Sequence, residues 1–205
     1  MNIHQSIILL AAIVMPCTVF ADEIASAALT EITSKKTKTF DVAGARLKGP
    51  TNFEISYPAS WGMSDYARPA LVARIASANG EGIDSLIILV RKGDPAIKEP
   101  TPDKVFTSDF ISEFALEGST IIRKERLKEG AFDGAVFEYL LEQSKPPIKV
   151  RTHVTNYIFT QNGAMVQLQF YVLLSEKANK DADDARIAAF KPLWKAIVTT
   201  LKLKK

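Results

Sequence analysis

Histidine and cysteine are scarce in this chain of 205 residues, which contains two histidines and one cysteine. Imidazole and thiolate groups carry much of the metal-binding and nucleophilic chemistry available near neutral pH. Only one histidine, His153, lies outside the N-terminal segment. One histidine cannot build a His-rich zinc site, and any Ser-His-Asp triad there would have to use His153. We expect His153 to be a packed or strand-edge residue. The weaker alternative is a hydrolase whose hydroxyl nucleophile or carboxylate pair lies near His153.

Carboxylates form one dense group, Asp181, Asp183 and Asp184. A calcium loop that starts at Asp181 needs glycine at its sixth position and glutamate at its twelfth, where this chain has Arg186 and Pro192. The group therefore predicts the acidic start of a helix. The sequence also lacks a G-x-S-x-G elbow and the glycine-rich loops that bind phosphate. We predict no catalytic residue, no cofactor and no metal.

The first 21 residues have the pattern of a cleavable secretory signal peptide. Residues 7–14 (IILLAAIV) form an uncharged apolar run, which is too short for a transmembrane helix of about 20 residues. Val19 and Ala21 suit the −3 and −1 positions of a signal peptidase site, so we predict cleavage after Ala21. The n-region has no lysine or arginine, and Cys17 leaves a lipid anchor or an uncleaved N-terminal anchor open as alternatives.

Cleavage at Ala21 would remove the only cysteine and leave His153 as the only histidine. An exported domain without disulfides must be stabilised by its core, which a chain with 47% hydrophobic residues can supply. The short signal and the lack of N-x-[ST] sequons favour a bacterial periplasm, with secretion or a membrane tether as minority alternatives. The formal net charge of +3 is mild. The basic excess lies near the ends of the mature chain, which predicts solvated tails and no nucleic-acid partner, with peripheral membrane contact left open.

Hydrophobic periodicity predicts one α+β domain over residues 51–205, preceded by a partly flexible lead-in over residues 22–50 that includes a short helix. An amphipathic helix is expected after Thr101 and Pro102, because Phe106, Phe110 and Phe114 recur every four residues. Pro192 must either kink the C-terminal helix or begin a second one. Strands are predicted over residues 53–57, 71–77, 85–90, 120–127, 134–141, 150–160 and 164–174, and the last helix over 187–201.

The clearest element is a hairpin around Asn162-Gly163, the preferred dipeptide of a type I′ turn. A two-residue turn pairs Gln161 with Ala164 and thereby fixes the register of both strands. One face, which includes His153 and Phe159, should meet the core. On the other face the register places Asn156 opposite Gln169, Ile158 opposite Gln167, and Val154 opposite Tyr171.

Four residues of this second face are our candidate partner surface: Asn156, Gln167, Gln169 and Tyr171, called the polar patch below. The alternative is that they form the solvent side of the sheet or lie beneath a second helix layer. Trp61 is a further candidate contact, with a core anchor as its alternative.

The chain resembles the Mog1/PsbP-like family over residues 50–203. The phrase F-E-I-S-Y-P-A-S-W at residues 53–61 matches the family's opening F-x-I-x-Y-P-x-x-W, and G-A-V-F-E-Y at residues 134–139 is similar as well. The resemblance implies an α/β/α sandwich around a central antiparallel sheet. Relatives include thylakoid-lumen subunits that assist photosystem II, a eukaryotic binder of a Ran-type GTPase, and bacterial envelope lipoproteins or chaperones. Their shared motifs are structural, so they transfer no binding residues to this chain.

Three hypotheses about function follow from these observations. The leading one is an exported, non-enzymatic binding or accessory protein that contacts another envelope protein through a surface. The second is a carrier of a small apolar or lipid-like ligand held between sheet and helix. The third is the hydrolase with an unrecognised site near His153.

Overall fold

A computed structural model describes residues 17–44, 51–64, 70–80, 82, 84–92, 119–145, 148–174 and 179–204. The described strands form two antiparallel sheets, one of seven strands in the order β3-β4-β5-β9-β8-β7-β6 and one of three in the order β1-β2-β10. The predicted α+β class with antiparallel sheets is therefore confirmed. The strands are β1 (Thr37–Asp41), β2 (Phe53–Pro58), β3 (Gly62–Ser64), β4 (Leu71–Ala76), β5 (Ser85–Lys92), β6 (Ser119–Glu129), β7 (Phe132–Lys145), β8 (Ile148–Gln161), β9 (Ala164–Leu174) and β10 (Lys202–Leu203).

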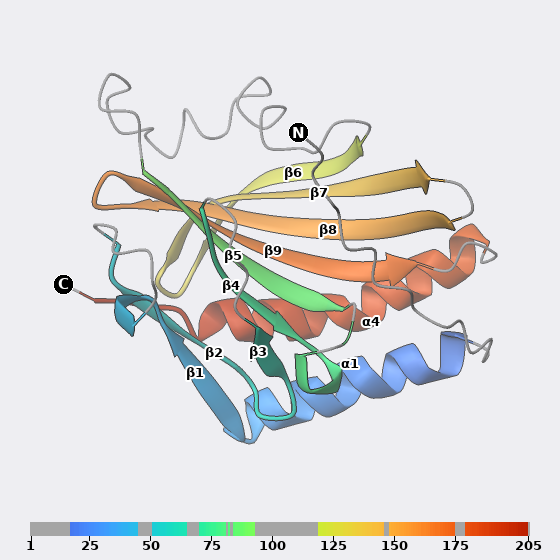
Figure 1. Cartoon of the computed structure of the whole chain (residues 1–205), viewed down its shortest axis with the longest axis horizontal. Coiled ribbons are helices and arrows are strands. Elements are labelled where there is room, and N and C mark those ends of the chain that lie inside the picture. Colours follow the sequence, from blue (N-terminus) through green and yellow to red (C-terminus); the bar gives the residue numbers. More distant parts are fainter. Residues whose placement is uncertain are drawn as a thin grey trace, which may run out of the picture.

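Two long helices, α1 (Cys17–Thr33) and α4 (Lys180–Thr199), lie side by side next to the large sheet (Figure 1). Short 3-10 turns occupy Val42–Gly44 and Ala78–Gly80. The helix predicted after Thr101, which a full α/β/α sandwich would place on the opposite side of the sheet, lies outside the described residues.

The main hydrophobic core lies between the helices and one face of the large sheet. Trp194 of α4 lies at its centre, with ring centroids 4.7 Å from Phe170, 5.0 Å from Phe190 and 6.0 Å from Trp61. All four rings are fully buried. Offset and edge-on contacts of this kind add to the free energy that burial of the rings already supplies.

The described part of the N-terminal lead-in contains a helix and a paired strand. Helix α1 runs to Thr33, and residues 37–41 form β1, which pairs along its whole length with β2. The C-terminal tail is likewise tied down, because β10 pairs with the other edge of β2. Lys204 contacts Asp41 at 2.6 Å and Glu54 at 3.0 Å, so this lysine is not a free solvated end. Neither β1 nor β10 shows the alternation of apolar and polar residues by which strands are recognised in a sequence.

Helix α4 is continuous through Pro192, so this proline does not begin a second helix. Asn179 caps the helix, with its Oδ1 accepting from the Ala182 backbone N–H at 3.0 Å. Asp181 and Asp183 occupy the first turn, as the acidic cluster predicted. Asp183 also pairs with Arg151 of β8 at 2.8 Å, which fastens the start of the helix to the sheet.

The β8–β9 hairpin has the predicted turn and register. Asn162 and Gly163 both have positive φ, at 51° and 74°, as a type I′ turn requires. Gln161 pairs with Ala164, and His153 pairs with Val172. The face with Tyr157 and Phe159 joins the main core, also as predicted.

Candidate functional site

The residues of the polar patch lie together as the register predicted. Asn156 of β8 pairs with Gln169 of β9, with Gln167 and Tyr171 on either side along β9. Gln169 Nε2 donates to Gln167 Oε1 at 3.4 Å, and the Tyr171 hydroxyl donates to Gln169 Oε1 at 3.1 Å. The three β9 side chains therefore form a hydrogen-bonded row beside Asn156.

The three amide side chains of the polar patch are buried and do not form an open surface, while Tyr171 is partly buried. Asn156, Gln167 and Gln169 have exposed fractions of 0, 1 and 6%. Within the described structure, neither side-chain amide atom of Asn156 has a hydrogen-bond partner, and Gln167 Nε2 has none. A buried polar group without a partner costs about 1–3 kcal/mol. The neighbouring side chains on this face are mostly apolar: Ala135, Phe137, Tyr139, Leu141, Val154, Ile158 and Met165.

Two tyrosines flank this patch. Tyr139 of β7 and Tyr171 of β9 lie on either side of Val154. Burial raises the pKa of both tyrosines above the ordinary value, so both hydroxyls remain protonated near neutral pH and can donate hydrogen bonds. The Tyr139 hydroxyl has no hydrogen-bond partner in the described part of the chain.

Trp61 is a core residue. It lies between β2 and β3, its side chain is 1% exposed, and its ring meets Trp194 edge-on. The structure therefore agrees with the alternative reading of Trp61 as a core anchor.

A charged cluster occupies the other face of the sheet, between the strands and α4. Glu138 of β7 lies at its centre, with Oε2 at 3.2 Å from His153 Nε2 and 3.1 Å from Lys191 Nζ, and Oε1 at 3.2 Å from an Arg123 nitrogen. Glu138 and His153 are buried. Burial would raise the pKa of Glu138, but hydrogen bonds from His153 and Lys191 outweigh it and lower this pKa from 4.5 to about 2.

A pocket of about 210 Å³ opens beside the charged cluster, between α4 and the β6 edge of the sheet. Its cations are paired with carboxylates, since Lys195 contacts Glu129 at 3.1 Å and Arg123 contacts both Glu125 and Glu138. The pocket is therefore polar and nearly balanced in charge. Its lining comprises Arg123, Glu125, Leu127, Glu129, Val136, Glu138, Thr155, Tyr157, Lys191, Trp194 and Lys195.

The hydrolase hypothesis requires a carboxylate pair or a hydroxyl nucleophile near His153, and the described residues place a single buried carboxylate, Glu138, against that histidine. His153 Nδ1 has no hydrogen-bond partner, and neither does the Thr155 hydroxyl two residues along the same strand, in the structure as described. A triad needs the second imidazole nitrogen within hydrogen-bond reach of a hydroxyl. Among the described residues, no group of three or more His, Cys, Asp and Glu side chains is placed to hold a metal ion.

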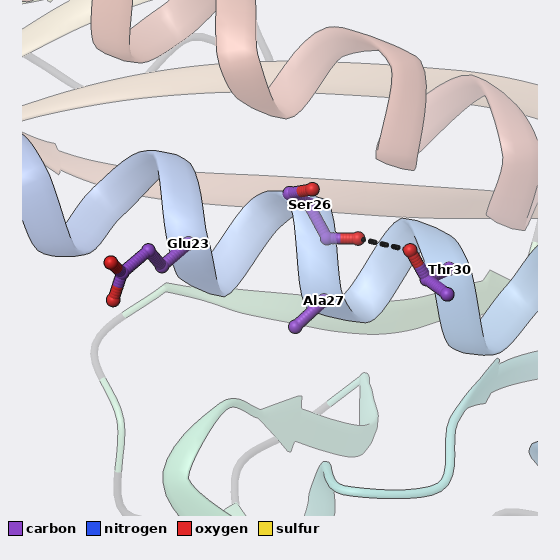
Figure 2. A pocket seen from close by; sticks show the side chains of 4 residues that line it. All are labelled: Glu23, Ser26, Ala27 and Thr30. Atoms are coloured by element: carbon purple, nitrogen blue, oxygen red, sulfur yellow. Dashed lines mark hydrogen bonds between the residues drawn. The ribbon is translucent and has the colours of Figure 1, made fainter.

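A second hollow lies on the outer side of α1, lined by Glu23, Ser26, Ala27 and Thr30 (Figure 2). The Thr30 hydroxyl donates to the Ser26 backbone carbonyl at 2.9 Å, so this hydroxyl is engaged within its own helix. Over the described residues, neither α1 nor α4 is both long and apolar enough to cross a membrane.

The charged cluster is the part of the site that sequence analysis missed. One signal for it was present: Glu138 alternates with Val136 and Leu140, so a charge interrupts one apolar face of its strand. A buried carboxylate needs cationic partners. Arg123 and Lys191 come from β6 and α4, and no local pattern relates those elements to Glu138.

No protein-family profile matches the chain, and no curated protein matches it significantly in sequence. Several solved structures resemble it. The Ran-binding protein Mog1p of Saccharomyces cerevisiae is 16% identical, with 82% of this chain and 95% of that chain covered and a TM-score of 0.47. LpqN of Mycobacterium tuberculosis, involved in cell envelope biogenesis, is also 16% identical, with 85% and 95% covered and a TM-score of 0.46.

A Bacteroides thetaiotaomicron structure is 14% identical, with 75% of this chain covered and a TM-score of 0.40. This chain spans 45% of the length of that protein. The α+β class of this chain is given by the strands and helices described above.

Proposed function

We propose that this chain is an exported, non-enzymatic binding protein of the cell envelope, and that the polar patch recognises a group on the molecule it binds. The observation that supports this proposal is the side-chain amide of Asn156, which is 0% exposed and has no hydrogen-bond partner within the described residues. Leucine is close to asparagine in size and would remove the cost of burying this amide. A binding partner that supplies a donor and an acceptor accounts for a polar residue at this position.

The leading candidate is a protein partner, which would contact the patch through an inserted polar group. A second candidate is a small ligand held against the sheet, and the burial of the three amide side chains favours it, because buried groups cannot meet a flat protein surface. A purely apolar ligand would leave the amides unpartnered. If the ligand is lipid-like, its polar head group is the part we place at the patch.

Asn156→Leu and Gln167→Met test this proposal because they should raise stability while lowering binding. Without a partner, we expect each to increase the free energy of unfolding by about 1 kcal/mol, since an unpartnered buried amide is removed. Both should abolish capture of the partner from envelope extract and any thermal shift caused by a small polar ligand. Urea unfolding and affinity capture with mass spectrometry measure the two effects.

Gln161→Met is the matched control, because Gln161 lies in the same hairpin with its amide satisfied. Its Nε2 donates to the backbone carbonyls of Asn52 at 2.9 Å and Lys204 at 3.2 Å. This variant should lose stability and keep binding. The proposal is wrong if the two patch variants gain stability and still capture the same partners as the unaltered protein.

Export is tested separately at the predicted cleavage point. Ala21 lies inside α1, and the buried side chains described in this helix, Ala25, Ala28 and Ile32, all follow it. Cleavage after Ala21 would therefore keep these three buried side chains in the mature chain. We expect intact mass and N-terminal sequencing of the protein from a bacterial periplasm to show a chain that begins at Asp22. A chain that keeps Met1, or a lipid on Cys17, would contradict cleavage there.

A further inference from the structure

Among the described strands, the seven-stranded sheet ends in a long strand that is unpaired on one side. β6 spans Ser119–Glu129 and pairs only with β7 among the described strands. The opposite edge of the sheet is β3, which has three residues. Every second residue of an unpaired edge presents its backbone N–H and C=O groups outward, so β6 offers a template for one more strand.

Two apolar side chains at the start of β6 are exposed. Ile121 and Ile122 have exposed fractions of 38 and 57% and are among the few large apolar residues of the described chain that reach solvent. A β-bulge separates Ile121 from Arg123 in the pairing with β7. Natural edge strands are commonly protected by charged residues and bulges. The exposed isoleucines work against such protection and provide an apolar contact for an added strand.

The remaining length of β6 carries a row of cations on one face of the sheet. Lys124, Arg126 and Lys128 alternate along the strand, while the intervening residues line the pocket on the other face. Arg126 and Lys128 contact the same carboxylate, Asp133 of β7, at 2.9 and 3.5 Å. Lys124 has no ion pair among the described residues. Positive charge thus exceeds negative charge among the described residues on this face of the edge.

A second copy of this chain does not fit the edge well. Antiparallel pairing of β6 with another β6 about a twofold axis sets cations opposite cations when Arg126 faces Arg126 or Lys124 faces Lys124. Like charges directly opposite each other in a sheet are destabilising. The occupant that suits the row is a strand with carboxylates at every second position, each facing a cation across the ladder.

We propose that the β6 edge binds an extended acidic segment of a partner protein, which adds to the sheet as an eighth strand. Acidic side chains at alternate positions pair with Lys124, Arg126 and Lys128, and an apolar residue at one end contacts Ile122. The backbone ladder supplies affinity, and the charges select the partner. This interaction does not depend on ligand binding at the polar patch, so either proposal can fail alone.

The probe is a fluorescein-labelled peptide of about eight residues, long enough for a typical strand, in which glutamate and valine alternate. Fluorescence anisotropy at low salt should show saturable binding to the full-length protein. The same peptide with lysine in place of glutamate should not bind. A peptide N-methylated along one edge keeps its charges but cannot form the ladder, and it should not bind either.

The protein variant Lys124→Glu/Lys128→Glu should weaken binding of the acidic peptide about tenfold or more, because two attractive cross-strand pairs become repulsive. Lys36→Glu/Lys202→Glu is the matched control, since it makes the same charge change at exposed lysines away from β6. Its affinity should stay within about twofold, because distant exposed charges are screened. Circular dichroism should show that both variants are folded.

Three results would overturn the proposal. The first is equal binding of the N-methylated and unmodified acidic peptides, which would leave only charge attraction. The second is equally tight binding of single-stranded oligonucleotide or phosphatidylglycerol vesicles that displaces the peptide, which would make the row a general anion surface. The third is no saturable binding of the acidic peptide to the unaltered protein.

Discussion

Arg186→Met is expected to lower the free energy of unfolding by about 3–5 kcal/mol at neutral pH, because it leaves a buried carboxylate without its cation. Asp84, just before β5, is buried, and a guanidinium nitrogen of Arg186 in α4 lies 2.9 Å from each of its carboxylate oxygens. The same arginine donates through Nε to the Leu173 carbonyl of β9 at 2.6 Å. Its loss therefore uncouples α4 from two neighbouring strands.

Acid should restore part of the stability of the Arg186→Met variant. Burial raises the pKa of Asp84 above its ordinary value, while Arg186 opposes that rise. Without Arg186, the pKa of Asp84 in the folded state rises further. A carboxyl group with a higher pKa in the folded state than in the unfolded state increases the stability of the fold as the pH falls through the folded-state pKa. The stability difference between variant and unaltered protein should therefore shrink toward pH 4. Urea unfolding across this range measures it.

A double variant separates the buried charge from lost packing. Asp84→Asn keeps an oxygen that accepts from the Leu173 N–H, a bond of 3.2 Å in the structure, and removes the charge. Combined with Arg186→Met, it should recover at least half of the stability lost in the single variant. A loss under about 1 kcal/mol for Arg186→Met, as for an exposed ion pair, would show that the Asp84–Arg186 contact is not structural.

Glu138→Gln should lower the free energy of unfolding at neutral pH by about 3 kcal/mol. This value is the free energy equivalent of a pKa lowered from 4.5 to about 2, and the unaltered protein loses the same contribution in acid. The folded pKa lies below the unfolded one, so this stability is fully present above pH 4.5 and is lost as pH falls toward 2. The variant should be less stable at pH 7 and should show a flatter acid dependence.

Glu142→Gln is the matched control, because Glu142 lies on the same strand and the same face as Glu138. Its side chain is 63% exposed and contacts Arg151 at 3.2 Å, so its removal should change stability by no more than about 1 kcal/mol. Denaturant unfolding at pH 7 and pH 3 compares the three proteins. An equal acid dependence in Glu138→Gln and the unaltered protein would contradict the assigned role of Glu138.

The polar patch shows how far local sequence rules reach. Asn162-Gly163 determines the turn, the turn determines the register, and the register places Asn156 and Gln169 side by side, so their adjacency was predictable. Their burial was not, because alternation assigns residues to faces and does not say what covers each face. Polar side chains on a sheet face normally indicate solvent.

The charged cluster and the Asp84–Arg186 pair needed the tertiary structure for a different reason. Arg186 follows Asp84 by 102 residues, and no periodicity or turn rule relates positions so far apart. In the sequence, Arg186 is notable only because it stands where a calcium loop needs glycine. In the fold, Arg186 neutralises the buried carboxylate of Asp84. β1 and β10 likewise depend on β2, which lies between them in their sheet.

The sequence by itself determined the α+β class, the β8–β9 hairpin with its register, and the scarcity of histidine and cysteine that limits the available chemistry. These features rest on local dihedral preferences, on short-range periodicity and on composition, all of which are readable along the chain. The tertiary structure alone decided that the amides of the polar patch are buried, that Glu138 and His153 meet, and that β6 is the edge of the sheet among the described strands. Those outcomes depend on which distant elements pack together, and packing is determined by the whole chain.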